Sequence, residues 1–201
     1  VPPARAMRIK ALLNERNDWD VEGMKAMMLD VVNPFDAQLA SGIKVALEKE
    51  QTWSDFEKEC LSLLDWDGSY DIDNPSPVLF QPLQVALMRQ GLKDEMSPSQ
   101  FDRFCETHYM RRACIVAISN PQHAMWDVTT TSEVETMEDH VVLVFKELTT
   151  RLAQEYGDNP SSWKWGDMHR WKPAHPFGEL PIIGNILNAE EHPVYGGNET
   201  I

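Results

Sequence analysis

Positive charge is scarce in this sequence. Its 201 residues contain 18 Lys and Arg against 32 Asp and Glu, which gives a formal net charge of -14. Proteins that bind nucleic acid or anionic lipid generally need clustered basic side chains to neutralise phosphates. The composition therefore argues against a general nucleic-acid-binding protein and against one that docks on an acidic membrane surface.

Long apolar runs are missing as well. Runs such as Ala113 to Ile118 and Val141 to Phe145 are far shorter than the about 18 apolar residues that a transmembrane helix needs. The chain starts at Val1 without an initiator Met, and its first residues lack the apolar segment of a secretory signal peptide. We expect no membrane span, and we expect the sequence to be a processed or cut piece of a longer protein.

Cysteines and the common catalytic signatures are rare or absent too. The three cysteines, Cys60, Cys105 and Cys114, are few and odd in number, and buried free thiols would account for them. If Cys105 and Cys114 share one helix, about 13 Å separates them, too far for a disulfide. Cys60 could pair with either, so the disulfide state stays open. No GxGxxG, phosphate-binding Gly-rich loop, HExxH, CxxC or GxSxG motif is present.

What the sequence does contain is apolar periodicity typical of helices. The hydrophobic content of 42% is enough for a packed core, and the length fits one domain or a large piece of one. Helices are expected over 4–14, from Asp20 to residue 31, from Asn33-Pro34 to residue 47, and over 52–63. The apolar positions of these segments are Met7, Leu12 and Leu13; Val21, Met24, Met28 and Val31; Phe35, Leu39, Ile43 and Leu47; and Phe56, Cys60 and Leu63.

Three later helices are expected from their start and stop signals. Residues 78–91 have a helical pattern but contain Pro82, so the helix either begins near Pro82 or kinks there. Residues 97–100 have the spacing of a capping box and predict a helix to about Ile118. Ser132 and Glu135 have the same spacing and predict a helix that ends at Gly157. Its expected apolar face is formed by Val134, Val141, Val144, Phe145, Leu148 and Leu152.

The character of the sequence changes after Gly157. Residues 158–201 are rich in proline, glycine, tryptophan and histidine, which indicates loops and short strands. We therefore predict a mainly α chain with a helical region, 1–157, and a loop and short-strand region, 158–201. So many aromatic side chains favour a tail that packs on the helices before it or on another part of the protein.

Two groups of residues could suggest a metal site. Residues 65–73 contain four aspartates, but an EF-hand loop would need glycine where Tyr70 or Ile72 stands, so a solvated turn is favoured. Asp167 and His169 would point to one side if 165–171 were extended, and His175 could complete three ligands of a metal-dependent hydrolase. The competing interpretation, which we favour, is that both histidines are hydrogen-bonded among the tryptophans.

A cysteine nucleophile is a further possibility. Cys105 and His108 stand three residues apart and would touch on one helix. A helix interior is a poor environment for an activated thiolate, and cysteine is a common core residue. We therefore favour the interpretation that Cys105 is an unreactive thiol of the core.

One string carries a resemblance to a known family. Residues 163–169, WKWGDMH, resemble the W-x-W-G-x-x-H segment of the penicillin acylase family, which includes acyl-homoserine-lactone acylases. The family's next H-P and G-G-x-x-T elements have counterparts in the same order, and residues 4–13 and 61–68 resemble its R-x-x-R-I-x-x-L-L and L-x-x-W-D-G elements. The residues that carry the later part of the resemblance are Trp163, Trp165, Gly166, His169, His175, Pro176, Gly196, Gly197 and Thr200. We expect them to be structural.

The resemblance implies a fold and an activity. Members of the family have a four-layer αββα sandwich, and this helical segment would pack on it. An N-terminal Ser of the large chain attacks an N-acyl amide with its own α-amino group as the base and forms a covalent acyl-enzyme. Members often bind calcium outside the segment resembled here and are usually exported to the periplasm, where they degrade antibiotics or quorum signals.

The resemblance transfers no catalytic, cofactor-binding or metal-binding residue to this chain. The first residue is Val1 rather than Ser, and the family's nucleophile, oxyanion Asn and calcium ligands precede the matching segment. We expect a segment that is inactive alone. Its expected partner is the remainder of the enzyme, namely the nucleophile-bearing part and the small chain, and the expected substrate is an N-acyl small molecule. The acyl group, the amine and the oligomeric state stay undetermined. The alternatives are a non-catalytic helical protein-interaction module and the metal-dependent hydrolase described above.

Overall fold

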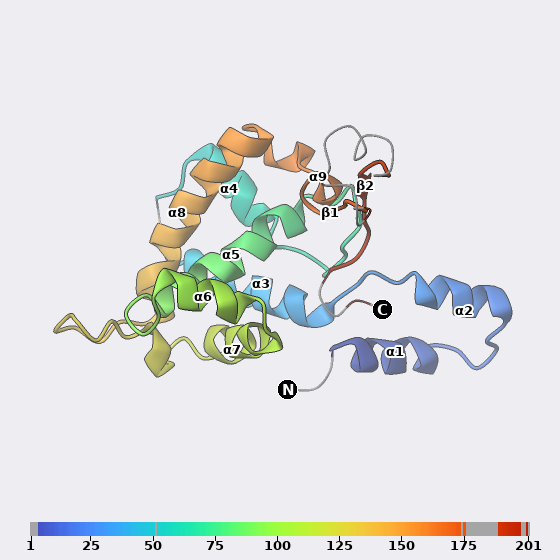
Figure 1. Cartoon of the computed structure of the whole chain (residues 1–201), viewed down its shortest axis with the longest axis horizontal. Coiled ribbons are helices and arrows are strands. Elements are labelled where there is room, and N and C mark those ends of the chain that lie inside the picture. The colour runs from blue at the N-terminus through green and yellow to red at the C-terminus, as the bar shows by residue number, and fades with distance from the viewer. Residues whose placement is uncertain (1–3, 51, 174, 176–188, 198–199, 201) are drawn as a thin grey trace.

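The computed structural model describes residues 4–50, 52–173, 175, 189–197 and 200, and it is mainly helical (Figure 1). This confirms the predicted class. The helices are α1 (Ala4–Asn14), α2 (Val21–Met28), α3 (Pro34–Leu47), α4 (Asp55–Ser62), α5 (Ser76–Gly91), α6 (Pro98–Cys105), α7 (His108–Ile118), α8 (Met137–Tyr156) and α9 (Trp165–Met168). Short 3-10 turns lie at Ala124–Trp126 and Pro160–Ser162, and the strands β1 (Arg170–Trp171) and β2 (His192–Pro193) pair antiparallel.

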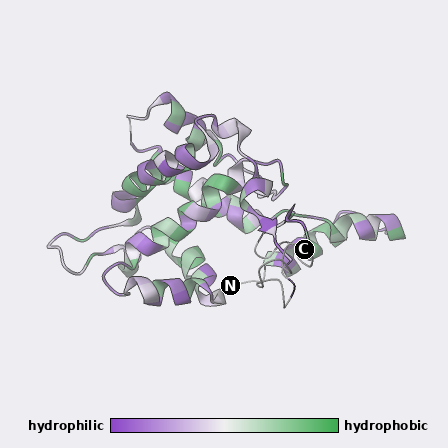
Figure 2. Ribbon diagram, turned by 45° about the horizontal axis from the view of Figure 1, so that its top comes forward, coloured by the Kyte–Doolittle hydropathy of each residue, from purple (hydrophilic) through white to green (hydrophobic). Residues whose placement is uncertain are grey.

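Helix α5 forms the centre of the body and packs chiefly along α8. Its side chains Phe80, Leu83 and Leu87 are fully buried, and they meet α8 side chains such as Phe145 in one hydrophobic core. Figure 2 shows hydrophobic residues along these central helices. Pro82 lies inside the continuous helix α5, so a helix that begins at Pro82 is excluded.

Several predicted helix starts are confirmed. The Asp20 carboxylate accepts a 2.7 Å hydrogen bond from the Gly23 amide at the start of α2. At the start of α6, the Ser97 amide donates to Oε1 of Gln100 at 2.9 Å, as a capping box requires. Each bond satisfies an amide that the first helical turn leaves without a partner.

Two predicted starts are wrong by a few residues. The fourth helix begins after Ser54, which forms a capping box with Glu57, rather than at residue 52. The box predicted at Ser132 lies instead at Thr136 and Asp139. Glu135 is used differently, because its carboxylate accepts bonds from the Val128 amide and the Thr131 hydroxyl and so holds the preceding loop. Val134 therefore lies outside α8 and is 80% exposed.

The single helix predicted over 98–118 is also wrong. The first helix ends at Cys105, and a new helix begins at His108, directly after Thr107. The Thr107 hydroxyl donates to the Phe104 carbonyl at 2.7 Å and accepts from the Tyr109 amide, so one side chain ends α6 and caps α7. Cys105 and Cys114 thus lie on different helices, and so do Cys105 and His108; all three cysteines are free thiols.

The core prediction fails for the first two helices. Met7 and Leu13 are 46% and 41% exposed, and Val21, Met24 and Met28 are exposed as well. The reason is that α1 and α2 form an arm (residues 4–30) that projects from the body, so that much of its apolar surface meets no other element (Figure 1). None of the helices in the described part of the chain is long and apolar enough to cross a membrane.

Candidate functional site

The W-x-W-G segment fastens the start of the C-terminal region to the body. The backbone amides of Trp165 and Gly166 donate to the carbonyls of Asn74 and Ile72 at 3.1 and 2.8 Å. A Cβ on Gly166 would lie 2.9 Å from Cβ of Pro193 and 3.2 Å from the Ile72 carbonyl oxygen, so a larger residue would not fit without a shift. This segment therefore depends on glycine at position 166 for its close approach to residues 72–74.

Both tryptophans of the segment are buried and satisfied. The Trp163 indole donates to the Gly157 carbonyl at 2.9 Å, and its ring meets the edge of Phe56. The Trp165 indole donates to the Gly196 carbonyl at 2.8 Å, and its ring stacks on His169 with centroids 4.8 Å apart. The prediction that the aromatic tail packs on the preceding helices is confirmed for these two residues.

His169 is engaged in the same cluster. Its Nδ1 lies 3.0 Å from the Val194 carbonyl oxygen. Because a carbonyl only accepts, the hydrogen-bond network assigns the proton to Nδ1. The His169 imidazole thus joins Trp165 to the segment that enters from β2, and the observed role is one of packing.

The G-G-x-x-T element meets the segment at Tyr70. The Gly196 amide donates to the Tyr70 carbonyl at 3.0 Å, and Gly196 has a φ of +83°, which favours glycine. A Cβ on Gly197 would lie 2.7 Å from the Tyr70 ring. Thr200 closes the turn through its hydroxyl, which donates to the Gly197 carbonyl at 3.1 Å. The residues that resemble the family's two separated motifs therefore converge on one aromatic ring.

Behind Tyr70 lies a buried polar network formed by Asn33, Asp36, Tyr70, Gln84 and Arg111. The Tyr70 hydroxyl donates to Oδ2 of Asp36 at 2.6 Å, and Nδ2 of the Asn33 side chain donates to the same oxygen at 3.1 Å. Arg111 donates to Oδ1 of Asp36 and to Oε1 of Gln84. The Asp36 and Arg111 side chains are only 0% and 8% exposed, so this is an ion pair inside the core.

The electrostatics of the network favour fixed protonation states. Burial raises the pKa of Tyr70 far above its ordinary value, and the Asp36 carboxylate raises it further, so the phenol stays a neutral donor. Burial opposes the charge of Arg111, but the Asp36 carboxylate more than offsets this and raises the pKa of the guanidinium. The sequence alone does not reveal the network, because its members come from three helices and a loop that are far apart in the chain.

The cysteine hypothesis assumed that Cys105 and His108 share one helix, which is wrong, and the electrostatics also oppose a reactive thiolate. Burial raises the pKa of Cys114 and of Cys60 to about 12, and it also raises the pKa of Cys105. A thiol is a nucleophile only as the thiolate, and such pKa values leave little thiolate at neutral pH. The observed hydrogen bonds of His123, His140 and His169 all go to backbone groups or to an amide side chain.

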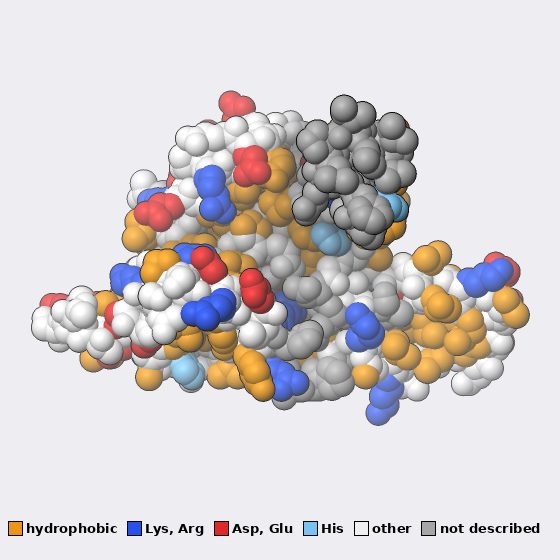
Figure 3. Space-filling view, viewed as in Figure 1, with side chains coloured by type: hydrophobic (Ala, Val, Ile, Leu, Met, Phe, Trp, Pro, Cys, Tyr) orange, Lys and Arg blue, Asp and Glu red, His pale blue; other side chains and the backbone are white. Residues whose placement is uncertain are grey.

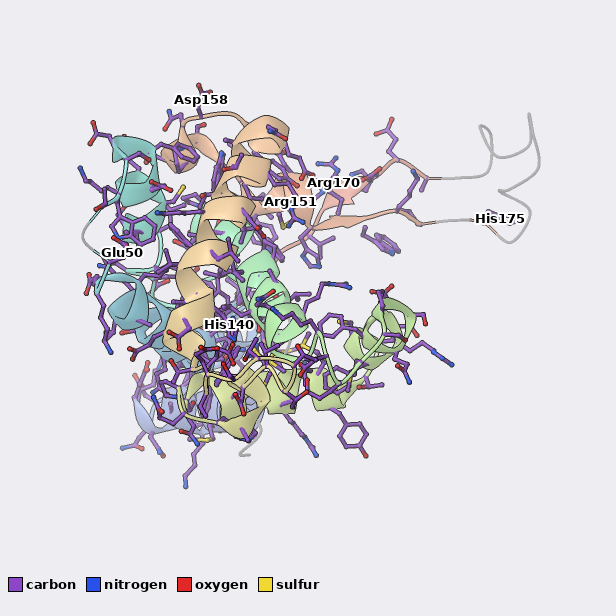
Figure 4. All side chains as sticks on the ribbon, turned by 90° about the vertical axis from the view of Figure 1, so that its left-hand side faces the viewer. Glu50, His140, Arg151, Asp158, Arg170 and His175 are labelled. Atoms are coloured by element: carbon purple, nitrogen blue, oxygen red, sulfur yellow. The ribbon has the colours of Figure 1, made fainter. Side chains whose placement is uncertain are left out.

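The premise of the metal hypothesis is wrong. Residues 165–168 form the helical turn α9 rather than a strand, Asp167 is exposed on it, and His169 bonds to a backbone carbonyl. His175 is exposed beyond the end of β1 (Figure 4). Within the ranges that the structure describes, no three His, Cys, Asp or Glu side chains gather as metal ligands would. Pro176 of the resembled H-P pair lies outside these ranges.

The acidic stretch at 65–73 is a turn with local partners. Asp65 and Asp73 form ion pairs with Lys44 and Lys164 at 2.6 and 2.7 Å. Asp67 accepts a 2.8 Å bond from the Ser69 amide. These carboxylates stabilise the connection between α4 and α5, on which Tyr70 stands.

Comparison with known proteins gives one family match. The family model described as penicillin amidase matches residues 1–201. Curated protein sequences give no match.

Proposed function

Because the chain belongs to the penicillin amidase family, we propose that it is a segment of an amidohydrolase that cleaves an N-acyl amide through a covalent acyl-enzyme. The family match over the whole chain is the observation that carries this proposal. In the reaction, a terminal Ser hydroxyl outside this chain attacks the amide carbonyl and passes its proton to the adjacent α-amino group. The amine then leaves with a proton, and water hydrolyses the ester to release the carboxylic acid.

The part of this segment in the reaction is to support the catalytic apparatus rather than to react. The residues of the family motifs are used in packing: Trp165 and His169 stack, and Gly197 lies against Tyr70. The raised pKa values of the three thiols argue in the same direction. We therefore propose that the 201-residue chain alone does not turn over an amide.

The proposed partner is the remainder of the enzyme, including the nucleophile-bearing part and an αββα sandwich on which this segment packs. The arm supports a protein contact, because Met7, Leu13 and Val21 expose apolar side chains on it. Because members of the family are usually exported, we further propose that the protein acts in the periplasm or is secreted.

The test is a comparison of two proteins against N-phenylacetyl and N-acyl-homoserine-lactone substrates. The purified 201-residue chain should release no amine, whereas the product of its complete reading frame should release amine with an initial burst. Turnover by the chain alone would refute the support role. Absence of turnover by the complete product, with both substrate classes, would refute the amidohydrolase proposal.

The exposed arm also favours a second candidate function, a non-catalytic protein-interaction module. The same assay separates the two candidates, because a module would give no amine from either protein. A partner should then bind the arm, and exchange of Val21 for Ser should weaken that binding.

A further inference from the structure

A groove lies where the arm joins the body. It has a volume of about 490 Å³ and is lined by residues 28–31, at the base of the arm, together with Tyr195, Gly196 and Thr200. Met28, Leu29 and Tyr195 are 69%, 78% and 55% exposed. The volume falls within the range of about 300–1,000 Å³ that is typical of small-molecule sites. Figure 3 shows hydrophobic side chains gathered over the arm beside this region.

Several polar groups of the groove wall already have partners. The Asp30 carboxylate receives two bonds from Arg8, at 3.0 and 2.6 Å. The Val31 carbonyl accepts from the Tyr70 amide, and the Gly196 carbonyl accepts from the Trp165 indole. A ligand that needed hydrogen bonds from these groups would have to break these contacts. The occupant that fits this part of the wall, beside the exposed Met28 and Leu29, is therefore apolar, and the unbranched Met28 side chain can adapt to a flexible chain.

Two described cations, Arg5 and Arg8, contact residues that line the groove. Arg5 donates through Nε to the Thr200 carbonyl at 2.6 Å, which fixes its guanidinium beside the lining. In contrast to Arg8, it takes part in none of the salt bridges formed by described residues. Its remaining N–H groups can therefore bind an anionic head group, which a carboxylate would supply.

We propose that this groove binds an alkyl carboxylate, with the chain against Met28 and Leu29 and the carboxylate at Arg5. The inference rests on the groove alone and is independent of the proposed enzymatic function. Because burial of each methylene stabilises the bound state, affinity should rise about tenfold for every two carbons added to the chain.

The test uses the chain labelled with ¹³C at its ten methionine methyl groups. Titration with monomeric octanoate and decanoate should shift the Met28 methyl signal saturably, while the signal of Met88, which is fully buried in the core, should not move. Exchange of Met28 for Leu assigns the signal. Equal shifts at Met7 and Met24 would mean unspecific coating of the arm and would overturn the proposal.

Two variants probe the two ends of the ligand. Leu29→Ser should weaken decanoate binding about tenfold or more, whereas Leu143→Ser, at an apolar residue of α8 that is 51% exposed, should leave it unchanged. Arg5→Gln should weaken decanoate about fivefold without changing the affinity for decanol, and Arg112→Gln, at an exposed residue of α7, should change neither.

Two other occupants are tested in parallel. Sedimentation with phosphatidylglycerol vesicles asks whether the groove binds lipid in a bilayer, and ultracentrifugation without ligand asks whether a second copy of the chain fills it. Vesicle binding or dimer formation that Leu29→Ser abolishes, with no saturable effect of decanoate, would overturn the proposal.

Discussion

The Tyr70 hydroxyl lies 2.6 Å from Oδ2 of Asp36, and this bond connects the C-terminal segment to the buried ion pair of the core. On one side of Tyr70, Gly197 and Trp165 pack against its ring. On the other side, Asp36 holds Arg111. A change at Tyr70 should therefore affect both the core and the packing of the segment that carries the family motifs.

Tyr70→Phe removes this hydroxyl and keeps the ring. Asp36 loses a hydrogen-bond donor in the core, and the side-chain amide of the half-buried Gln81 loses its acceptor, so we expect a loss of about 1–3 kcal/mol in the free energy of unfolding. Urea denaturation measures it. Tyr109→Phe, at a residue that is 69% exposed, is the matched control and should change the stability by less than about 0.5 kcal/mol.

Asp36→Asn leaves the Arg111 guanidinium buried without its counter-ion. We expect a loss of about 3–5 kcal/mol in unfolding free energy, because the uncompensated charge stays in the core. The double variant Asp36→Leu with Arg111→Met removes both charges and should recover much of this loss. A double variant no more stable than Asp36→Asn alone would contradict the buried-charge explanation.

Local signals account for what the sequence predicted well. Asp20 and the Ser97–Gln100 pair mark helix starts through bonds within three residues, so the sequence contains the whole interaction. The bond of Thr107 is equally short in sequence. However, a threonine inside an apolar pattern does not predict that its hydroxyl will donate to the Phe104 carbonyl and end the helix. The break at residue 106 was therefore missed.

Packing partners account for what could not be predicted. The spacing of Val21, Met24 and Met28 correctly indicates an amphipathic helix, but it does not say whether another element covers the apolar face. Asp36 and Arg111 are separated by 75 positions, and neither has a local pattern that identifies the other. The family motifs could be recognised in sequence, yet their convergence on Tyr70 follows from tertiary contacts alone.

Gly197→Ala should disturb the packing of the C-terminal segment. The added methyl would lie 2.7 Å from the Tyr70 ring, and we expect a cost of about 1–3 kcal/mol together with a change in near-UV circular dichroism from Tyr70 and Trp165. Gly42→Ala is the control, because its methyl would meet no atom within 4 Å in helix α3. That exchange should stabilise by about 0.5–1 kcal/mol.

The three thiols should react in a fixed order. Cys60 and Cys114 are buried with pKa values raised to about 12, whereas Cys105 is only half-buried. At pH 8, a disulfide reagent such as DTNB should therefore modify Cys105 first and the other two only after unfolding by urea. Cys105→Ser should abolish the early phase. An early phase that persists in this variant would show that a buried thiol is accessible.

The loop after Trp126 should be released by acid. The Thr129 hydroxyl and amide both donate to Oδ2 of Asp94 at 2.7 Å, and these bonds lower the pKa of Asp94 to about 2. Because the folded pKa lies below the ordinary value of 3.8, the bonds stabilise the loop above pH ~4 and are lost as the pH falls toward about 2. The Thr129 amide shift in NMR measures this transition. Asp94→Asn should remove the acid transition of that amide, while Asp102→Asn, at an exposed carboxylate paired with Arg89, should leave it in place.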